Sequence, residues 1–348
     1  MNTYSPPRIL LGLTLDELTE VAAYYGLRPF AARQMARWLY EKRVTSISEM
    51  TDLPAAVRRR MEEELQVGRY APKAEAISVD GTAKYLWEGA GGCDIESVFI
   101  PDRDRATLCV SSQAGCKMGC TFCMTGRQGF HGQLTTAQII NQVFSVPGSE
   151  RLTNLVFMGM GEPADNADNV IKAIEILTAK WGAARSPGRI TVSSIGAIPG
   201  LKKILDLTKV HIAISLHSPL ASQRLELMPV EKAFPIAEVL SLLRGYDFAH
   251  QRRLSFEYIM FDGVNSSMRS AAALGRMLKG LHCRVNLIRF HAIPGSPLKG
   301  CSQEVMEQFR DRLNEMGITA TIRASRGEDI MAACGMLAGR QRKTTEES

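Results

Sequence analysis

The strongest constraint on the fold is a series of short apolar segments that recur between residues 106 and 293. In chain order they are "ATLCVSS", "TNLVFMGM", "RITVSSIG", "VHIAISLH", "LSFEYIMF" and "RVNLIRFHAI". Apolar runs of this length, separated by stretches of helical periodicity, predict repeated strand–helix units and therefore a parallel sheet. We expect an α/β fold of six such units in a partly closed barrel, with a doubly wound open sheet as the alternative.

Polar residues follow several of these segments where each strand would end, as in "GMGEP", "SLH" and "RFHAIPG". Barrels of parallel strands carry their chemistry at this end of the sheet. We therefore expect the functional site there.

The N-terminal part of the chain has a different texture. Residues 14–25, 30–42 and 53–65 are amphipathic stretches separated by Gly, Pro and Ser/Thr/Asp breaks, and they predict three short helices. We expect a helical accessory domain over residues 1–75, a β-rich linker over 76–101, and the barrel over 102–330. A C-terminal segment, 331–348, ends in "QRKTTEES", which is typical of a disordered tail.

Charge is concentrated in the accessory domain. The chain carries a formal net charge of +6. Much of the excess lies between residues 28 and 60, where the basic residues are Arg28, Arg33, Arg37, Lys42, Arg43, Arg58, Arg59 and Arg60. Aromatic residues are interleaved with them. The pattern fits nucleic-acid binding, or equally an ordinary helical surface whose aromatic residues face the core.

The sequence also bears on the compartment. No apolar run reaches the roughly 18 residues of a membrane span, and the first residues lack the pattern of a secretory signal. We expect a cytoplasmic protein with no membrane partner. Its eight cysteines would then be reduced, which favours metal-binding or catalytic roles.

Three of these cysteines stand within eight residues, in "SSQAGCKMGCTFCMTG". Cys116, Cys120 and Cys123 form C-x3-C-x2-C on a glycine-containing loop after the first barrel strand. A zinc site would need a fourth ligand, for which His131 is a candidate. A [4Fe-4S] cluster can be held by three thiolates, which leaves one iron open to a ligand. The residues alone leave both readings open, beside a chance group of inert cysteines.

The motif, with Phe122 directly before its last cysteine, resembles the radical S-adenosylmethionine superfamily. The resemblance extends further, because "ESVFIPDRDRATLCVSSQAGC", "VFMGMGEPADN", "AISLHSP", "RGEDIMAACGMLAG" and the N-terminal "LRPFAARQMARWLYEK" are similar to successive signatures of the RlmN/Cfr family of radical RNA methyltransferases. It implies a [4Fe-4S] cluster and S-adenosylmethionine, two molecules per turnover. It also implies 23S rRNA and tRNA as partners, and an electron donor such as flavodoxin with its reductase. We expect a monomer.

The resemblance implies a set of site residues. The cluster would be held by Cys116, Cys120 and Cys123. The positions that match cofactor contacts are Gly161, Glu162, Ser193, Ser215, Leu216, His217 and His291. At His291 the relatives carry Asn, and His can make similar hydrogen bonds.

It also implies a mechanism. Cys334 would be methylated by one S-adenosylmethionine, and a second would supply the radical that removes hydrogen from the S-methyl group. The methylene would then join an adenine ring carbon. Cys109 would deprotonate the adduct and close a disulfide with Cys334, and Glu96 matches the position of a proton acceptor. By sequence alone, both cysteines fit small buried hydrophobic residues and Glu96 an exposed carboxylate.

The implied target is C2 of a specific adenosine in the peptidyl-transferase centre of 23S rRNA, and adenosine 37 of tRNAs. "RPFAARQ" and "RGEDIMAACGMLAG" favour this branch over a Cfr-type C8 methyltransferase, which is the first alternative. A non-catalytic, zinc-stabilised RNA-binding protein is the alternative from another class.

Overall fold

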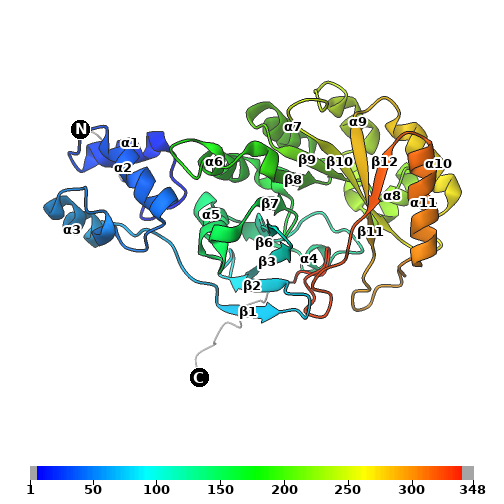
Figure 1. Ribbon diagram of the computed structural model, residues 1–348, viewed down its shortest axis with the longest axis horizontal. Coiled ribbons are helices and arrows are strands. Elements are labelled where there is room, and N and C mark those ends of the chain that lie inside the picture. Colours follow the sequence, from blue (N-terminus) through cyan, green and yellow to red (C-terminus); the bar gives the residue numbers. More distant parts are fainter. Residues whose placement is uncertain (1–5, 339–348) are drawn as a thin grey trace.

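The computed structural model describes residues 6–338, so the predicted disordered tail "QRKTTEES" lies outside the described residues. Three N-terminal helices lie on one side of a large twisted sheet, and most other helices cover the outer face of that sheet (Figure 1). Between residues 6 and 338, no helix is both long and apolar enough to span a lipid bilayer.

The sheet has ten strands in the order β1-β2-β3-β4-β7-β8-β9-β10-β11-β12. Its parallel part comprises β4 (Arg105–Cys109), β7 (Asn154–Phe157), β8 (Ile190–Ser194), β9 (His211–Ser215), β10 (Leu254–Met260), β11 (Cys283–Arg289) and β12 (Thr319–Ile322). These strands stand side by side in chain order. A doubly wound sheet would reverse its order at a switch point, so the barrel-type prediction is confirmed.

The parallel part has one strand more than the six predicted. β12 pairs with β11 at the edge of the sheet, and only one of its four residues is buried. The central strands match their sequence signal better. β10 is buried along nearly its whole length, as expected for a parallel strand covered on both faces.

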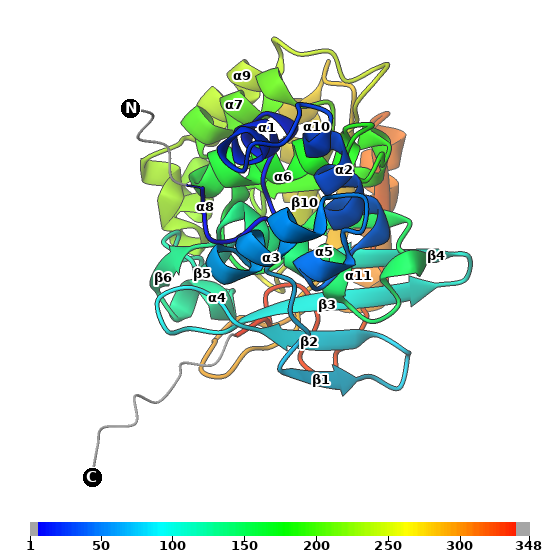
Figure 2. The same ribbon diagram turned by 90° about the vertical axis from the view of Figure 1, so that its left-hand side faces the viewer.

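Three antiparallel strands extend the opposite edge: β1 (Ala74–Ile77), β2 (Ala83–Trp87) and β3 (Ile95–Asp102). β2 alternates buried and half-buried residues, which is the period of a strand with one face on the core. The region expected as a β-rich linker therefore continues the barrel sheet through the pairing of β3 with β4. Figure 2 shows these strands below the N-terminal helices.

Helices connect the parallel strands: α5 (Thr136–Ser145), α6 (Ala167–Thr178), α7 (Ile198–Leu207), α8 (Ala221–Leu227), α9 (Ile236–Leu243), α10 (Met268–Leu278) and α11 (Gln303–Glu315). Local sequence explains where they begin. At α5 the Thr135 side chain accepts from the Gln138 N–H while the Gln138 side chain accepts from the Thr135 N–H. This capping box satisfies two N–H groups that a helix start would otherwise leave free.

The accessory domain contains α1 (Leu15–Tyr24), α2 (Ala31–Ala36), which continues as a π-helical turn to Lys42, and α3 (Ala55–Glu64). It docks against α5 and α6 of the barrel. Lys172 pairs with Glu17 at 2.6 Å, and the Tyr40 ring lies between those of Phe144 and Trp181. The domain is thereby fixed against the barrel.

The C-terminal segment returns from β12 across the open side of the sheet to the β1–β2 turn. There the Gly327 N–H donates to Asp80, and the Ser78 hydroxyl donates to Asp329 at 2.5 Å. These contacts hold the segment over the carboxyl ends of the strands, where the site was expected.

Candidate active site

A cavity opens at the carboxyl ends of the parallel strands. Its empty space is about 1170 Å³, including solvent at its mouth, which is in the range of ligand-binding pockets. Residues from five of the seven parallel strands line it, together with the loop that carries the three cysteines and the C-terminal segment. Of the predicted site residues, the lining includes Cys109, Cys116, Cys120, Cys123, Gly161, Glu162, Ser193, Ser215, His217 and Cys334.

The cysteine loop is held at its base by a small ladder. β5 (Gln113–Gly115) pairs with β6 (Phe130–Gln133), and α4 (Met124–Arg127) follows the last cysteine. On the far side, the Thr121 N–H donates to the Leu227 carbonyl at the end of α8. The loop therefore presents its thiols toward the cavity from a fixed frame.

The thiols of Cys116, Cys120 and Cys123 are a donor set that fits an iron–sulfur cluster. Burial raises the pKa of all three, to about 12 for Cys116, so the protein alone disfavours their thiolate forms and a cationic centre would be needed to stabilise them. Within residues 6–338, no three His, Cys, Asp or Glu side chains converge on a site for one metal ion. A four-iron cluster takes one thiolate per iron and does not require such convergence.

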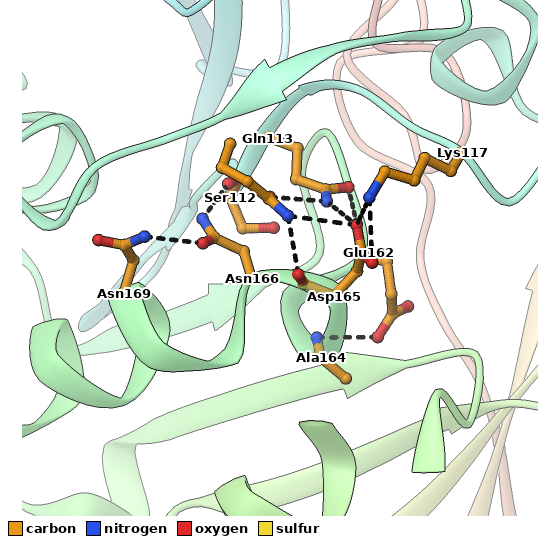
Figure 3. Close-up of polar contacts among 9 residues, drawn as sticks. Ser112, Gln113, Lys117, Glu162, Ala164, Asp165, Asn166 and Asn169 are labelled. Atoms are coloured by element: carbon orange, nitrogen blue, oxygen red, sulfur yellow. Dashed lines mark hydrogen bonds and ion pairs between the residues drawn. The ribbon is translucent and has the colours of Figure 1, made fainter. Parts of the chain in front are cut away.

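Glu162 follows β7 and is almost fully buried. Its Oε1 accepts from the Ala164 N–H at 3.0 Å, and its Oε2 accepts from the Ile195 N–H at 2.9 Å (Figure 3). Burial nevertheless raises the pKa of this carboxyl to about 7. Gly161 has φ +96, and a Cβ there would lie 2.4 Å from the Gln113 Cβ, so only glycine fits beside this carboxylate.

Figure 3 shows how the cysteine loop is tied to Glu162. Gln113 accepts from the Glu162 N–H through its Oε1 and donates to Asp165 through its Nε2, at 2.8 and 2.7 Å. Lys117, between Cys116 and Cys120, pairs with Asp165 at 2.9 Å. None of these partners was anticipated, because their sequence positions carry no recognisable signal.

His217 lies just beyond β9. Burial lowers the pKa of its imidazole to about 3, so the ring is neutral at physiological pH. Its Nδ1 accepts from the Ile259 N–H, which leaves the proton on Nε2 as a donor. The ring of Phe122 meets it edge-on at 4.9 Å between centroids. His217 is therefore a fixed, uncharged donor in the cavity wall.

Cys109 ends strand β4, and Cys334 lies on the C-terminal segment, yet both line the cavity. Neither forms a disulfide. Burial raises the pKa of Cys109 to about 12, while Cys334 is exposed. The Met124 N–H donates to the Gly335 carbonyl and the Thr125 hydroxyl to the Leu337 carbonyl. These bonds bring the segment around Cys334 to the helix that follows the cysteine loop.

Three predicted residues lie outside the cavity lining. Glu96 is buried rather than exposed: it pairs with Lys84 at 3.1 Å and accepts from the Ala338 N–H at 3.0 Å, so it anchors the C-terminal segment. His291 also contacts that segment, through Ser325 and Glu328. Leu216 is fully buried.

Sequence reasoning missed two charged residues in the cavity wall, Glu257 on β10 and Arg323 just after β12. A signal existed for Glu257, since it is an isolated acid in the apolar strand "LSFEYIMF". Arg323 had none. The pKa of its guanidinium is raised, first by Cys334 and then by Glu257 and Cys109.

A buried arginine braces the strand ends. Arg224, on α8, is fully buried and forms an ion pair with Glu231. Its Nη2 donates to the carbonyls of Ile195 and Ser215, beyond β8 and at the end of β9. α8 thus connects these strand ends to the cysteine loop, which bonds to the last residue of the same helix.

The parallel barrel and the three-cysteine loop at its carboxyl end define a radical S-adenosylmethionine protein, and residues 110–273 match the Radical SAM superfamily. Residues 9–67 match the ribosomal RNA large subunit methyltransferase N-terminal domain. A probable dual-specificity RNA methyltransferase RlmN of Parabacteroides distasonis is 57% identical over 95% of this chain and 96% of its own length. The dual-specificity RNA methyltransferase RlmN of an Anaeromyxobacter species is 40% identical, over 96% and 93%. The chain belongs to the RlmN family.

A solved structure agrees with this assignment. The crystal structure of a radical SAM methyltransferase from Sphaerobacter thermophilus superposes with a TM-score of 0.89 at 38% identity, and the match covers 95% of this chain and 99% of that one. The superfamily implies a [4Fe-4S] cluster and S-adenosylmethionine. The zinc-stabilised, non-catalytic alternative is therefore set aside.

Proposed function

We propose that this protein methylates C2 of a specific adenosine in the peptidyl-transferase centre of 23S rRNA and of adenosine 37 in tRNAs, by a radical mechanism. The observation that carries the proposal is the meeting of Cys109 and Cys334 in the cavity that also holds the three-cysteine loop. Two further thiols beside a cluster site are the equipment for covalent transfer of carbon to RNA.

Cys116, Cys120 and Cys123 would hold the cluster. Gly161, Glu162, Ser193, Ser215 and His217 line the adjoining wall and would hold S-adenosylmethionine. When bound, the pair supplies one-electron cleavage of the sulfonium and thereby removal of a hydrogen atom from an unreactive carbon. Leu216 and His291 are proposed contacts of the same cofactor, although their side chains lie behind the cavity wall.

The protein's own thiols would carry the carbon. Cys334, exposed on its segment, accepts a methyl group on sulfur, and that carbon later becomes bonded to the adenine. Cys109 then removes the proton from the ring carbon of the adduct, with Glu96 as a further proton acceptor. The Cys109 sulfur attacks the Cys334 sulfur, the sulfur–carbon bond breaks, and its electron pair takes a proton to complete the new methyl group. Each turnover would use two molecules of S-adenosylmethionine.

The accessory domain is the proposed RNA-binding surface. Arg28, Arg33 and Arg59 are exposed and form no ion pair within residues 6–338. Arg60, in contrast, pairs with Glu64 at 3.5 Å and stacks on the Tyr25 ring. The unpaired arginines are available to phosphates. We further propose a cytoplasmic monomer that receives electrons from a flavodoxin and its reductase.

The test is product analysis. Anaerobically reconstituted protein is incubated with 23S rRNA fragments or tRNA, reductant and deuteriomethyl S-adenosylmethionine, and the RNA is digested for mass spectrometry. We expect labelled 2-methyladenosine. Labelled 8-methyladenosine would instead assign the Cfr-type activity, and unlabelled RNA with intact cofactor cleavage would overturn the proposal.

A further inference from the structure

The Glu257 carboxylate is held in place but only half satisfied. The side chain is 4% exposed. Its Oε1 accepts from Asn286 Nδ2 at 2.8 Å and from the Ser255 hydroxyl at 3.0 Å. Its Oε2 makes no hydrogen bond with any residue in the described part of the chain. An unbonded buried carboxylate oxygen is costly, so its place in the cavity wall indicates a ligand that donates to it.

Arg323 places a donor beside that acceptor. Among the described residues, it is the only lysine or arginine that lines the cavity. Its backbone N–H donates to the Leu287 carbonyl at 2.9 Å, which fixes the main chain. Its Nη1 lies 3.6 Å from Glu257 Oε2 and 3.7 Å from Met158 Sδ. The cavity therefore presents an acceptor and a donor side by side.

This pair is complementary to one edge of adenine. On the Watson–Crick edge the N6 amino group donates and N1 accepts, and enzymes that act on an extruded base read this edge by hydrogen bonds. Guanine and uracil present the opposite order, which would set a carbonyl oxygen against the Glu257 carboxylate. A neutral adenine edge would satisfy Oε2 without adding a charge.

The edge also determines which ring carbon approaches the thiols. C2 is bonded to N1, whereas C8 lies in the five-membered ring on the other side of the base. Cys334 is the nearest acidic partner of Arg323 by its effect on the guanidinium, ahead of Glu257 and Cys109. A base whose N1 meets Arg323 would therefore turn C2 toward Cys334.

We propose that Glu257 and Arg323 read the Watson–Crick edge of the target adenine, the carboxylate accepting from the N6 amino group and the guanidinium donating to N1, and that this selects C2. The inference rests on the proposed function and adds its specificity determinants. Both residues are binding residues for the base.

The test pairs an altered enzyme with an altered substrate. Two RNAs carry either adenosine or purine riboside, which lacks the 6-amino group, at the target position. Wild-type protein should methylate the purine riboside RNA about 10- to 100-fold more slowly, the effect of one lost charge-assisted hydrogen bond. Glu257→Leu should be as slow on adenosine RNA, with no further loss on purine riboside.

Ser255→Ala is the matched control. It touches Glu257 Oε1 only, which Asn286 still holds, so discrimination between the two RNAs should persist. Iron content and circular dichroism report folding. If Glu257→Leu is unstable, Glu257→Gln keeps the volume and should show weakened discrimination.

Three results would overturn the inference: equal wild-type rates on both RNAs, undiminished discrimination in Glu257→Leu, or weaker binding of S-adenosylmethionine by that variant, which would assign the carboxylate to the cofactor. A wild-type protein that cleaves S-adenosylmethionine but methylates neither RNA would instead overturn the proposed function.

Discussion

The Glu162 carboxyl should release a proton when S-adenosylmethionine binds. Burial raises its pKa to about 7, so near neutral pH the free site is partly protonated. The amino group of the cofactor would favour the ionised form and return the pKa toward the ordinary value of 4.5. Mass action at pH 6.5 then gives a release of about 0.7 protons per cofactor bound, and the contribution of Glu162 to affinity should rise about fourfold between pH 6.5 and 8.

Anaerobic titration calorimetry in two buffers of different ionisation enthalpy measures this release. At pH 6.5 an α-amino group, with a pKa of about 7.7–8.0, is already protonated, so it contributes little. Glu162→Gln, which keeps the size of the side chain, should bind more weakly with almost no proton release. The reasoning is refuted if wild-type protein releases no proton at pH 6.5, or if the glutamine variant releases as many.

Three further perturbations test separate parts of the molecule. Cys120→Ala should abolish iron loading and cleavage of S-adenosylmethionine, and iron and sulfide analysis with full turnover intact would contradict the cluster assignment. Reversing Arg28 and Arg33 to Glu should lower the magnitude of the salt slope of RNA binding by about 0.7–0.9 per lost phosphate contact, with RNA-free cofactor cleavage unchanged; an unaltered slope would assign them to ordinary surface. Arg224→Met should cost about 3–5 kcal/mol in urea unfolding because it leaves Glu231 buried without its cation, and adding Glu231→Gln should recover part of the loss; additive losses would exclude this cause.

The parallel core could be predicted from the sequence because buried strands have a strong local signal. Strands β4 and β7 to β11 coincide with the six apolar segments, and their order along the sheet follows from right-handed strand–helix units. β12 has no such signal, since Thr319 and Thr321 are exposed at the edge of the sheet. The joining of β1 to β3 onto the barrel depends on pairing between strands, which local periodicity does not specify.

The cysteine motif and the strand-end residues were predictable because their spacing is itself the signal. Glu257 and Arg323 could not be found as a pair, because their approach depends on how β10 and β12 are placed in the sheet. Glu96 shows a related limit. Its sequence position indicated a surface carboxylate, whereas the return of the C-terminal segment buries it against Ala338 and Lys84.

The central claim is a division of labour between Cys334, which would carry the carbon, and Cys109, which would resolve the adduct. Each is replaced by Ala, and the two variants are incubated with RNA, S-adenosylmethionine and reductant, then run on denaturing gels with iron content verified. Cys109→Ala should accumulate a protein–RNA adduct that survives denaturation, while Cys334→Ala should form none. Equal, modest destabilisation of both variants without any adduct is the result expected of two packing residues, and it would contradict the account.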